Sequence, residues 1–589
     1  ALSQRSGGRE AESCGMIAYM TNQDLVSAAP RKIDRSYNPY DPDLIFKPSP
    51  LPSPFPPPSR YFSGHSATSP TDGPVQDIQE RRNIYVATWN VAAVNNNPFE
   101  YWITHDDPAY NRLMDDVQDF LDQPGQRDVP VSDVFTHQMF EELMHEMSGV
   151  GMQGLETVGK FWWEDYSKRP IISGFIKDTS IGKKRLASMP DRITNTITTA
   201  HNGVVRRPTV INHFDGDLPS LGSWWKQWRE FMFRSKVQVF KGSKPAQEPQ
   251  FIYELLDPIY KSKYPAITEE EEACSIPLQI VCLAIFDAIL NHMLSVVAPD
   301  TWQQIRRSIG DALLRNKDKQ TASVLAETYA ETDVIFLQEA SGAFVKGASA
   351  QQLSPKFSIL LPPKMDGKRD QNSIILVNRA RFVEDSAVDI TEEVMEMVTK
   401  LASGPSAKKT YVHGDLVVFR VKAREEGFFI LASFHGDTNG LGTKPIVEAL
   451  HATAVTSYPD HKLVVGLDAN TYKVHSEQYQ GVKHFHDFLI SRGMASCWGG
   501  NPDPLRPTTC NARTYLQPQL NKAISRHNRL TKADKNLKDW IIFDEKQMEM
   551  HCTTRDNTGK CQYINDMVFP TMQFPSDHAV VASVLLLKR

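Results

Sequence analysis

Apolar runs alternate with polar segments along the chain from Asn83 onward. Short runs rich in β-branched and aromatic residues predict β-strands. The predicted strands span 83–89, 333–338, 357–361, 372–378, 415–421, 427–434, 462–467, 539–543 and 579–587. Helical spacing of apolar residues predicts helices between several of them, such as 319–331 and 443–456. Many strands with interspersed helices predict two sheets packed face to face, with helices on the outside.

One long interval interrupts this alternation. Residues 97–318 contain segments with helical spacing at 111–122 and 134–147, so they are interpreted as a large, mainly helical insertion between the first two core strands. The core domain is then predicted to comprise residues 79–96 and 319–589. Residues 1–78 include PSPLPSPFPPPSR at 48–60, a composition typical of an extended or disordered segment.

Composition narrows the class of protein only modestly. The 589 residues are 41% hydrophobic and carry a formal net charge of -5, which argues against a protein that coats nucleic acid non-specifically but allows a local basic groove. Seven cysteines show no CxxC spacing, so free thiols in a reducing compartment are expected. A soluble protein of an intracellular or organellar compartment is favoured, and a pairing of Cys552 with Cys561 stays open.

The longest apolar stretch, 276–298, carries Asp287, Asn291 and His292. Polar and charged side chains are costly within a bilayer, so a buried core helix is favoured over a membrane span, and no transmembrane segment is predicted.

Acidic and amide residues stand at the ends of several predicted strands. They are Asn90 in IYVATWN, Glu339 in DVIFLQE, Asp468 and Asn470 in LVVGLDAN, Asp539 in KDWIIF, and Asp577 with His578 in FPSDHAVV. Each motif alone also fits a turn or a solvated strand end. Their joint occurrence in one order, each closing an apolar strand, is harder to explain by packing. Oxygen ligands of this kind hold Mg²⁺ against a phosphate, and a neighbouring histidine can activate water.

The ordered set TWN, LQE, GLDAN, a KDWI-type aspartate and a terminal SDH resembles the endonuclease/exonuclease/phosphatase superfamily. The resemblance covers residues 83–94 and about 319–589. It implies an α+β fold, a four-layer αββα sandwich of the DNase I-like kind, here with the helical insertion. The GLDANTY block and the absence of a WCDR block make an inositol phosphatase less probable within that superfamily.

The resemblance also implies a role for each residue. Glu339 would be the principal metal ligand, with Asn90 and Asp577 completing or supporting the site, and the cofactor would be Mg²⁺ or Mn²⁺. Asp468 would position or deprotonate the attacking water, and Asn470 would hold a phosphate oxygen. His578 would pair with Asp539, and His435 would contact the phosphate or protonate the leaving group.

Two segments bear on the substrate. The basic segment 521–538 directly precedes Asp539 and is expected near the site, where it could bind phosphates or form a solvated loop. The aromatic cluster Trp224, Trp225, Trp228, Phe231 and Phe233 could stack bases or meet lipid headgroups, but packing within the insertion is favoured.

The sequence therefore predicts a metal-dependent hydrolase of phosphate esters, with a nuclease-like phosphodiester as the favoured substrate and nucleic acid as a possible partner. The alternatives are a phosphatase or lipid phosphodiesterase of the same superfamily, or a catalytically silent scaffold. The 97–110 end of the insertion (Trp102, His105, Asp106, Asp107) is expected nearest the site, where it would narrow access in favour of a small or single-stranded substrate. The pattern predicts no oligomeric state.

Overall fold

The computed structural model describes residues 83–588, except 94, 202, 242–243, 247, 366–369 and 402–413. The extended segment predicted over 1–78, and Cys14 within it, lie outside the described residues.

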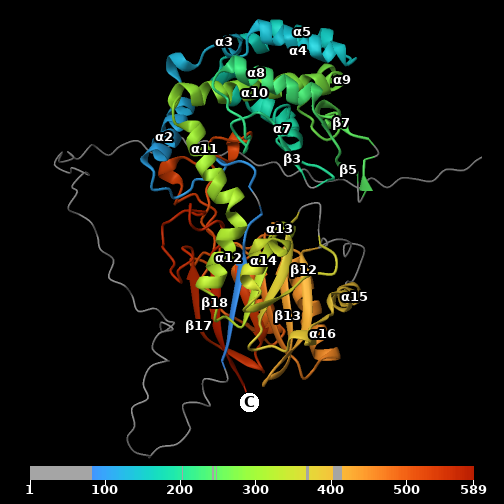
Figure 1. Cartoon of the computed structure of the whole chain (residues 1–589), viewed down its shortest axis with the longest axis vertical. Coiled ribbons are helices and arrows are strands. Elements are labelled where there is room, and N and C mark those ends of the chain that lie inside the picture. Colours follow the sequence, from blue (N-terminus) through green and yellow to red (C-terminus); the bar gives the residue numbers. More distant parts are fainter. Residues whose placement is uncertain are drawn as a thin grey trace, which may run out of the picture. The chain divides into compact units, whose positions relative to one another are not determined.

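Two six-stranded sheets form the core domain (Figure 1). The first has the order β17 (Met548–Asp556), β18 (Val580–Leu587), β1 (Asn83–Asn90), β8 (Val334–Ala340), β10 (Asn372–Asn378) and β9 (Phe357–Leu360). The second has the order β11 (Val388–Asp389), β12 (Leu416–Ala423), β13 (Gly427–His435), β14 (Lys462–Asp468), β16 (Asp539–Asp544) and β15 (Met494–Ser496). The nine predicted strands are all present, within two residues at each end. Strands β11, β15 and β17 were not predicted.

The two sheets bury an apolar layer between them. Val86, Val334 and Phe336 of the first sheet join Leu431 and Val464 of the second in one buried cluster. The two sheets approach each other closely at Gly466 of β14, where a Cβ atom would lie 2.3–2.5 Å from the side chain of Phe336. Any larger residue would clash with Phe336, so the close packing of the two sheets requires glycine at this position.

Helices complete the outer layers. Helices α15 (Thr391–Leu401), α16 (Thr443–Ser457) and α17 (Val482–Ser491) pack their apolar residues into the cluster of the second sheet. Helices α12 (Lys317–Glu327), α13 (Gly342–Lys346) and α14 (Ala348–Leu353) pack into the cluster on the other face of the first sheet. This is the predicted four-layer αββα sandwich.

The interval between β1 and α12 is largely helical, as expected. Its helices are α2 (Pro108–Asp122), α3 (Val131–Val134), α4 (His137–Gly149), α5 (Leu155–Glu164), α6 (Thr179–Lys184), α7 (Ser188–Thr194), α8 (Leu221–Arg234), α9 (Glu269–Ala273), α10 (Ser275–Val297) and α11 (Trp302–Gly310). Short strands pair as β2 (Thr196–Thr198) with β3 (Val204–Arg206), β4 (Lys236–Val237) with β7 (Gln250–Phe251), and β5 (Phe240–Lys241) with β6 (Lys244–Pro245). The domain boundaries at 78, 96 and 318 stay a prediction.

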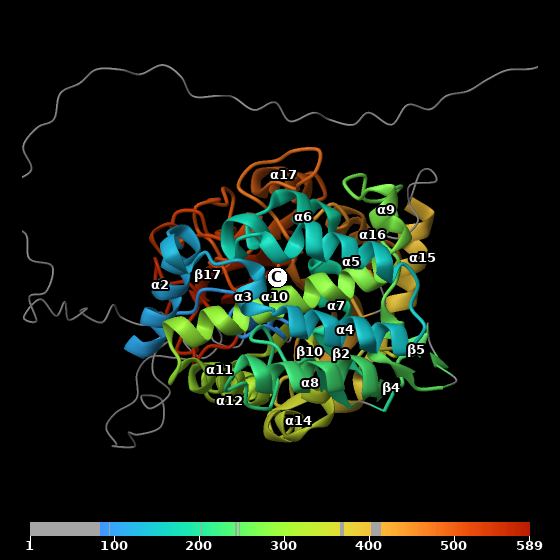
Figure 2. The same cartoon turned by 90° about the horizontal axis from the view of Figure 1, so that it is seen from above.

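Helix α10 is the centre of this region (Figure 2), and α2, α3, α7 and α8 contact it. Among the described residues it is the one helix long and apolar enough to cross a membrane, yet 78% of its most apolar window is buried in the protein. Its Asp287 is fully buried and accepts hydrogen bonds from Arg207, Thr209 and Trp228. These contacts are those of a core helix.

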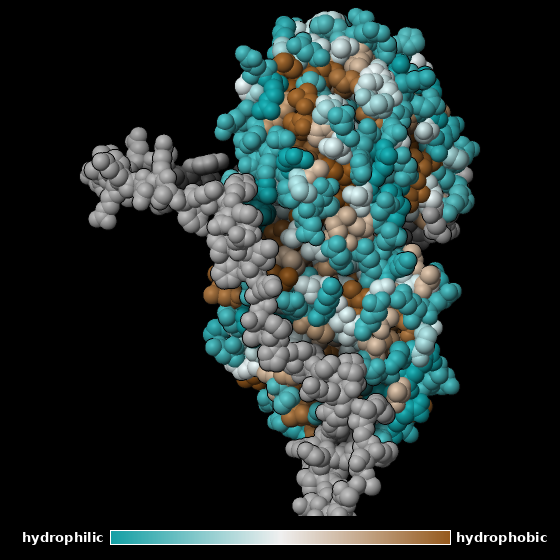
Figure 3. Space-filling model, turned by 60° about the vertical axis from the view of Figure 1, so that its left-hand side comes forward, coloured by the Kyte–Doolittle hydropathy of each residue, from teal (hydrophilic) through white to brown (hydrophobic). Residues whose placement is uncertain are grey.

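The aromatic cluster of α8 packs in the interior. Trp224 and Trp228 are 0% exposed, and Trp225 is 4% exposed with its ring stacked on Trp228. Packing was the favoured interpretation, and burial excludes these rings as a surface for bases or lipid. On the face drawn in Figure 3, hydrophilic residues predominate and the hydrophobic ones lie in separate groups.

Two details of the predicted helices were wrong. The segment 134–147 is not one helix, because α3 ends at Val134 and α4 begins at His137. Thr136 makes the break, since its side chain accepts a hydrogen bond from the Met139 N–H and caps the second helix. The helix predicted over 319–331 ends at Glu327. Cys552 and Cys561 are both free, so the pairing that was left open is not formed.

Candidate active site

Strand topology brings the predicted site residues to one edge of the sandwich. β1 runs parallel to β8, and β13 runs parallel to β14, so Asn90, Glu339, His435 and Asp468 all stand at carboxyl ends of strands. β16 is antiparallel to β14, and Asp539 pairs directly with Asp468 at its amino-terminal end. β18 is antiparallel to β1, which places His578, just ahead of β18, at the same edge.

Asn90 joins two carboxylates at the centre of the site. Its Nδ2 donates to Glu339 Oε1 and to Asp468 Oδ2, both at 3.0 Å, and its Oδ1 accepts from the Ala92 N–H. The two acceptors fix this orientation of the amide, since the opposite orientation would place its oxygen against both carboxylates. Glu339 Oε2 also accepts from the Ala93 N–H at 2.6 Å. The amide of Asn90 thus holds the two acidic groups close together.

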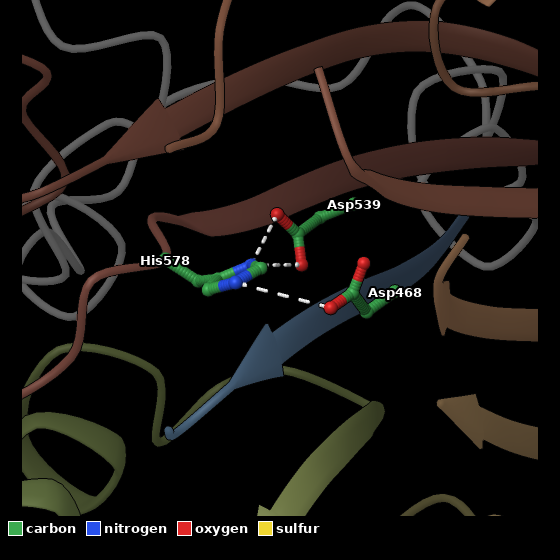
Figure 4. A group of neighbouring side chains, drawn as sticks. All are labelled: Asp468, Asp539 and His578. Atoms are coloured by element: carbon green, nitrogen blue, oxygen red, sulfur yellow. Dashed lines mark hydrogen bonds and ion pairs between the residues drawn. The ribbon is translucent and has the colours of Figure 1, made fainter. Parts of the chain in front are cut away.

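His578 and Asp539 form the expected pair. Nδ1 of His578 lies 3.0 and 3.1 Å from the two carboxylate oxygens of Asp539, and Nε2 lies 3.8 Å from Asp468 Oδ2 (Figure 4). Asp539 is fully buried and also accepts a hydrogen bond from Thr508 Oγ1 at 2.5 Å. The Asp539 carboxylate therefore fixes the orientation of the imidazole and leaves Nε2 facing Asp468.

His435 and Asn470 also lie close to the carboxylates. Nε2 of His435 lies 3.3 Å from Glu339 Oε1 and 3.7 Å from Asp468 Oδ2. The Asn470 N–H donates to Asp468 Oδ1, and its side-chain Nδ2 donates to the Gly436 carbonyl. Asp577 accepts a hydrogen bond from Asn511 Nδ2 at 3.0 Å. All eight residues predicted for the site are thus at this edge, although their roles stay predictions.

The charges of the site depend strongly on one another. Burial lowers the pKa of His578, but Asp539 and Asp468 outweigh this effect and raise it to about 10. Burial raises the pKa of Glu339, yet His435, Asn90 and His578 together bring it below its ordinary value. The pKa of Asp468 is lowered as well, because the two histidines outweigh its burial. The pKa of Asp539, by contrast, is raised, because its burial and the nearby Asp468 outweigh the effects of His578 and Thr508.

The backbone is strained where the site is built. Ala92, Glu339 and Asn470 have φ angles of 58°, 59° and 47°, in the left-handed region that residues with a Cβ seldom adopt. Strain of this kind persists only where surrounding contacts impose it, and it gathers at functional sites. In Glu339 the turn out of β8 directs the carboxylate at Asn90.

A cleft of about 630 Å³ opens from these residues. The basic segment predicted to lie near the site does so, because Lys522, Lys532 and Lys538 line the cleft together with Glu339 and Asp577. Not every basic residue of the segment faces it. Arg526 instead forms an ion pair with Asp115 of α2.

Both ends of the helical interval reach the site. Tyr101 lines the cleft, and Trp102 Nε1 donates to the Ile524 carbonyl of the basic segment. Lys317, at the start of α12, is 5% exposed and donates to the Ala93 carbonyl. The expectation placed the 97–110 end nearest the site and named no residue of the other end. Residues within 97–103 and 309–317 line a neighbouring cavity that shares Glu339, Asp577 and His578 with the cleft. His105 instead stacks on Tyr110.

Several contributors were not found from the sequence. Thr508 and Asn511 lie in a loop between the named strands and helices. Lys317 is the first residue of α12, whose first turn is charged, as the first turns of many helices are. No spacing signal marks any of them. They are recognised only because the fold brings them against Asp539, Asp577 and the Ala93 carbonyl.

One group at this edge has the composition and spacing of a metal site. Single ligand atoms of Asp468, Asp539 and His578 lie within 4.8 Å of one another, and all three residues are buried. This group could bind a metal ion. The hydrogen bond between His578 and Asp539 already engages two of its members, whereas Glu339 and Asp577 also present carboxylates to the cleft.

Comparison with known proteins gave fold relatives but no curated match. A domain of unknown function (DUF8234) matches residues 128–307, within the helical interval. No curated protein matches the chain. Among solved structures, TDP2 of D. rerio complexed with single strand DNA product is 12% identical, with a TM-score of 0.30, over 47% of this chain and 94% of that one. The human Nocturnin catalytic domain with bound sulfate is 14% identical, with a TM-score of 0.31, over 48% and 89%.

A third similar structure is an endonuclease/exonuclease/phosphatase family protein from Bacteroides thetaiotaomicron. It is 13% identical, with a TM-score of 0.29, and the match covers 46% of this chain and 89% of that one. The two sheets and their covering helices form the four-layer αββα sandwich that the superfamily resemblance implies.

Proposed function

We propose that this protein is a divalent-metal-dependent phosphodiesterase. The observation that carries the proposal is the convergence of Glu339, Asp468 and the Asp539–His578 pair at one end of both sheets, facing a cleft lined by lysines. Packing gives no reason to gather three carboxyl groups and two histidines, because like charges held together in the interior oppose one another. A phosphate ester and its cation do give such a reason.

The donor set suits a hard cation. Glu339 and Asp577 would hold it, with Asp468 close by, and carboxylate oxygens are the ligands that Mg²⁺ and Mn²⁺ prefer. Asn90 would support the site from behind, since its amide NH₂ faces the carboxylates and its oxygen is engaged by Ala92. A bound divalent cation would neutralise phosphate charge and offset the mutual repulsion of the carboxylates.

The residues of the chain would share the proton transfers of hydrolysis. Asp468, kept ionised by the two histidines, would accept a hydrogen bond from the attacking water and take its proton. As the oxygen of that water bonds to phosphorus, the ester P–O bond opposite breaks and His435 would give a proton to the leaving oxygen. His578, protonated and fixed by Asp539, would stabilise the charge on the phosphate oxygens, and Asn470 would donate to one of them.

The cleft favours a diester with further negative charge. Lys522, Lys532 and Lys538 line the side formed by the basic segment, and Arg513 lies there as well. Lys538 already pairs with Asp534, and Arg513 pairs with Glu100, so Lys522 and Lys532 are the lysines of the cleft that a further phosphate would engage. A strand of nucleic acid would place its neighbouring phosphates along them.

The test is a hydrolysis screen of the purified protein with Mg²⁺ or Mn²⁺. The substrates are bis-p-nitrophenyl phosphate, single- and double-stranded DNA, RNA, inositol phosphates and sphingomyelin. We expect cleavage of diesters, abolished by EDTA and restored by either cation. Glu339→Gln is the negative control. Cleavage of monoesters alone would overturn the diester assignment, and a protein inactive on every substrate would be a silent scaffold.

A further inference from the structure

A second cavity adjoins the catalytic cleft. Its volume is about 330 Å³, and it shares Glu339, Asp577 and His578 with the cleft, so the proposed catalytic residues stand between the two spaces. Lys317 closes it on the side of the carboxylates. A phosphodiester has two esterified groups. The cleft and the second cavity both adjoin the residues at which its phosphorus would lie, so each space would receive one of the two groups.

The walls of this cavity differ from those of the cleft. About half of its lining is apolar: Pro98, Ile103, Ile309, Leu313, Pro570 and Pro575. The other half is polar and includes Asn95, Asn97 and Glu100 beside the proposed catalytic residues. Most of the apolar residues belong to the two ends of the helical interval, where Leu313 lies on the π-helical turn Asp311–Arg315 between α11 and α12. The helical interval therefore contributes most of the apolar part of this wall.

A neutral histidine completes the wall. Burial lowers the pKa of His213 to about 4, and its Nε2 lies 3.2 Å from the Asn95 carbonyl. The imidazole of His213 lies against Gly310, the last residue of α11. A Cβ atom on Gly310 would lie 2.6 Å from His213 Nδ1, so the ring fits only because this residue is glycine. An uncharged ring and apolar side chains together form a surface suited to a flat group rather than to a phosphate.

Resting on the proposed phosphodiesterase function, we infer that this cavity binds a single planar ring system carried by the non-leaving ester group of the scissile phosphate. A volume of about 330 Å³ is at the lower end of the roughly 300–1,000 Å³ found for small-molecule sites, so it admits one ring system and excludes a continuing strand. The apolar part of the wall favours burial of a ring face, whereas the charged residues shared with the cleft receive the phosphate. A phenyl ester meets this description directly, and a nucleoside ester meets it through a base carried on its sugar.

The experiment compares two substrates that differ by one ring. Bis-p-nitrophenyl phosphate carries a ring on both sides of the phosphorus, and methyl p-nitrophenyl phosphate carries only one. The ratio of their kcat/KM values measures the contribution of the second ring. We expect the wild-type protein to favour the bis ester by about 10-fold or more, since burying a ring contributes at least 1.4 kcal/mol, which is tenfold in rate.

Leu313→Trp fills the cavity and should lower this ratio at least fivefold. Leu314→Trp is the matched control, because the neighbouring leucine does not line the cavity, and it should leave the ratio unchanged. Leu313→Ala enlarges the cavity and should shift preference toward a naphthyl ester. Circular dichroism checks that each variant is folded, and the alanine variant keeps the test decisive if the tryptophan variant is not.

The outcomes separate this inference from the proposed function. A wild-type protein that cleaves neither ester contradicts the phosphodiesterase proposal itself. Cleavage of both esters with a ratio that Leu313→Trp and Leu313→Ala leave unchanged would confirm the enzyme and overturn the ring site. Thymidine 5′-(p-nitrophenyl phosphate) has the same leaving group as methyl p-nitrophenyl phosphate, with thymidine in place of methyl. Its kcat/KM relative to the methyl ester then shows whether a nucleobase gains the same advantage as a second phenol ring.

Discussion

Removing the carboxylate of Asp287 should destabilise the helical interval severely. Asp287 is 0% exposed and accepts from Arg207 Nε at 2.7 Å and Nη2 at 3.2 Å, from Thr209 Oγ1 at 2.6 Å and from Trp228 Nε1 at 2.9 Å. Burial lowers the pKa of Arg207, yet Asp287 and Asp191 outweigh it and raise that pKa, so the guanidinium stays charged. In Asp287→Ala this buried charge keeps Asp191 as its one carboxylate partner.

Breaking a buried ion pair by removing one partner costs about 3–5 kcal/mol. For a folding unit of roughly 150–250 residues, each 1 kcal/mol shifts Tm by about 2–4 °C, so a fall of about 6–20 °C is expected. Circular dichroism at 222 nm during heating measures it, since this region is mostly helical.

Two further variants isolate the cause. Asp300→Ala removes an exposed carboxylate just beyond α10 and should change the free energy of unfolding by less than about 0.5 kcal/mol. The double substitution Arg207→Met with Asp287→Leu removes both fully buried charges and should recover part of the loss, since a buried pair is often replaced by apolar residues without cost. The recovery is incomplete because the ion pair of Arg207 with Asp191 is lost as well. An Asp287→Ala protein that melts with the wild type would refute the argument that this pair holds α10 in the interior.

Three other predictions concern the site and the sandwich. Asp539→Asn should lower kcat on bis-p-nitrophenyl phosphate by about 10³–10⁴-fold, and adding His578→Ala should lower it little further, because the two groups act as one unit. Additive losses in steady-state kinetics would show that the pair is not a unit. Glu339→Gln should weaken Mn²⁺ binding in isothermal titration calorimetry by at least tenfold while the far-ultraviolet spectrum is retained, and unchanged binding would remove Glu339 from the ligand set. Gly466→Ala should destabilise the sandwich by about 1–3 kcal/mol in urea, since its Cβ would lie 2.3 Å from Phe336, and an unchanged midpoint would mean that the sheets can separate without cost.

The sequence predicted the sandwich well because its strands are apolar on the inward face and end in recognisable polar residues. β17 was missed because residues such as Glu549, His551 and Arg555 give an edge strand a polar pattern. The break at Thr136 was missed because apolar spacing continues across it, and only the capping hydrogen bond ends the helix.

The candidate site shows the same limit. Residues at strand ends could be found, since a strand end and a carboxylate make a local pattern. Thr508, Asn511 and Lys317 act across 31, 66 and 224 positions of the chain, through contacts to Asp539, Asp577 and Ala93. No local pattern encodes such distances. The cavity between the two ends of the helical interval likewise follows from tertiary packing alone.

The position of β1 in its sheet has a consequence for synthesis of the chain. β1 is hydrogen-bonded to β8 on one side and to β18 on the other, so Thr88 has Phe336 and Val581 as cross-strand neighbours. A ribosome adding about 5–20 residues per second would leave β1 without its β18 neighbour for on the order of 25–100 s. Glu339 is made about halfway through that time and can then approach Asn90, whereas His578 emerges only at its end. The candidate site is therefore complete only once β18 has been made, and a chain that stops before β18 would carry an unpaired apolar strand open to other chains.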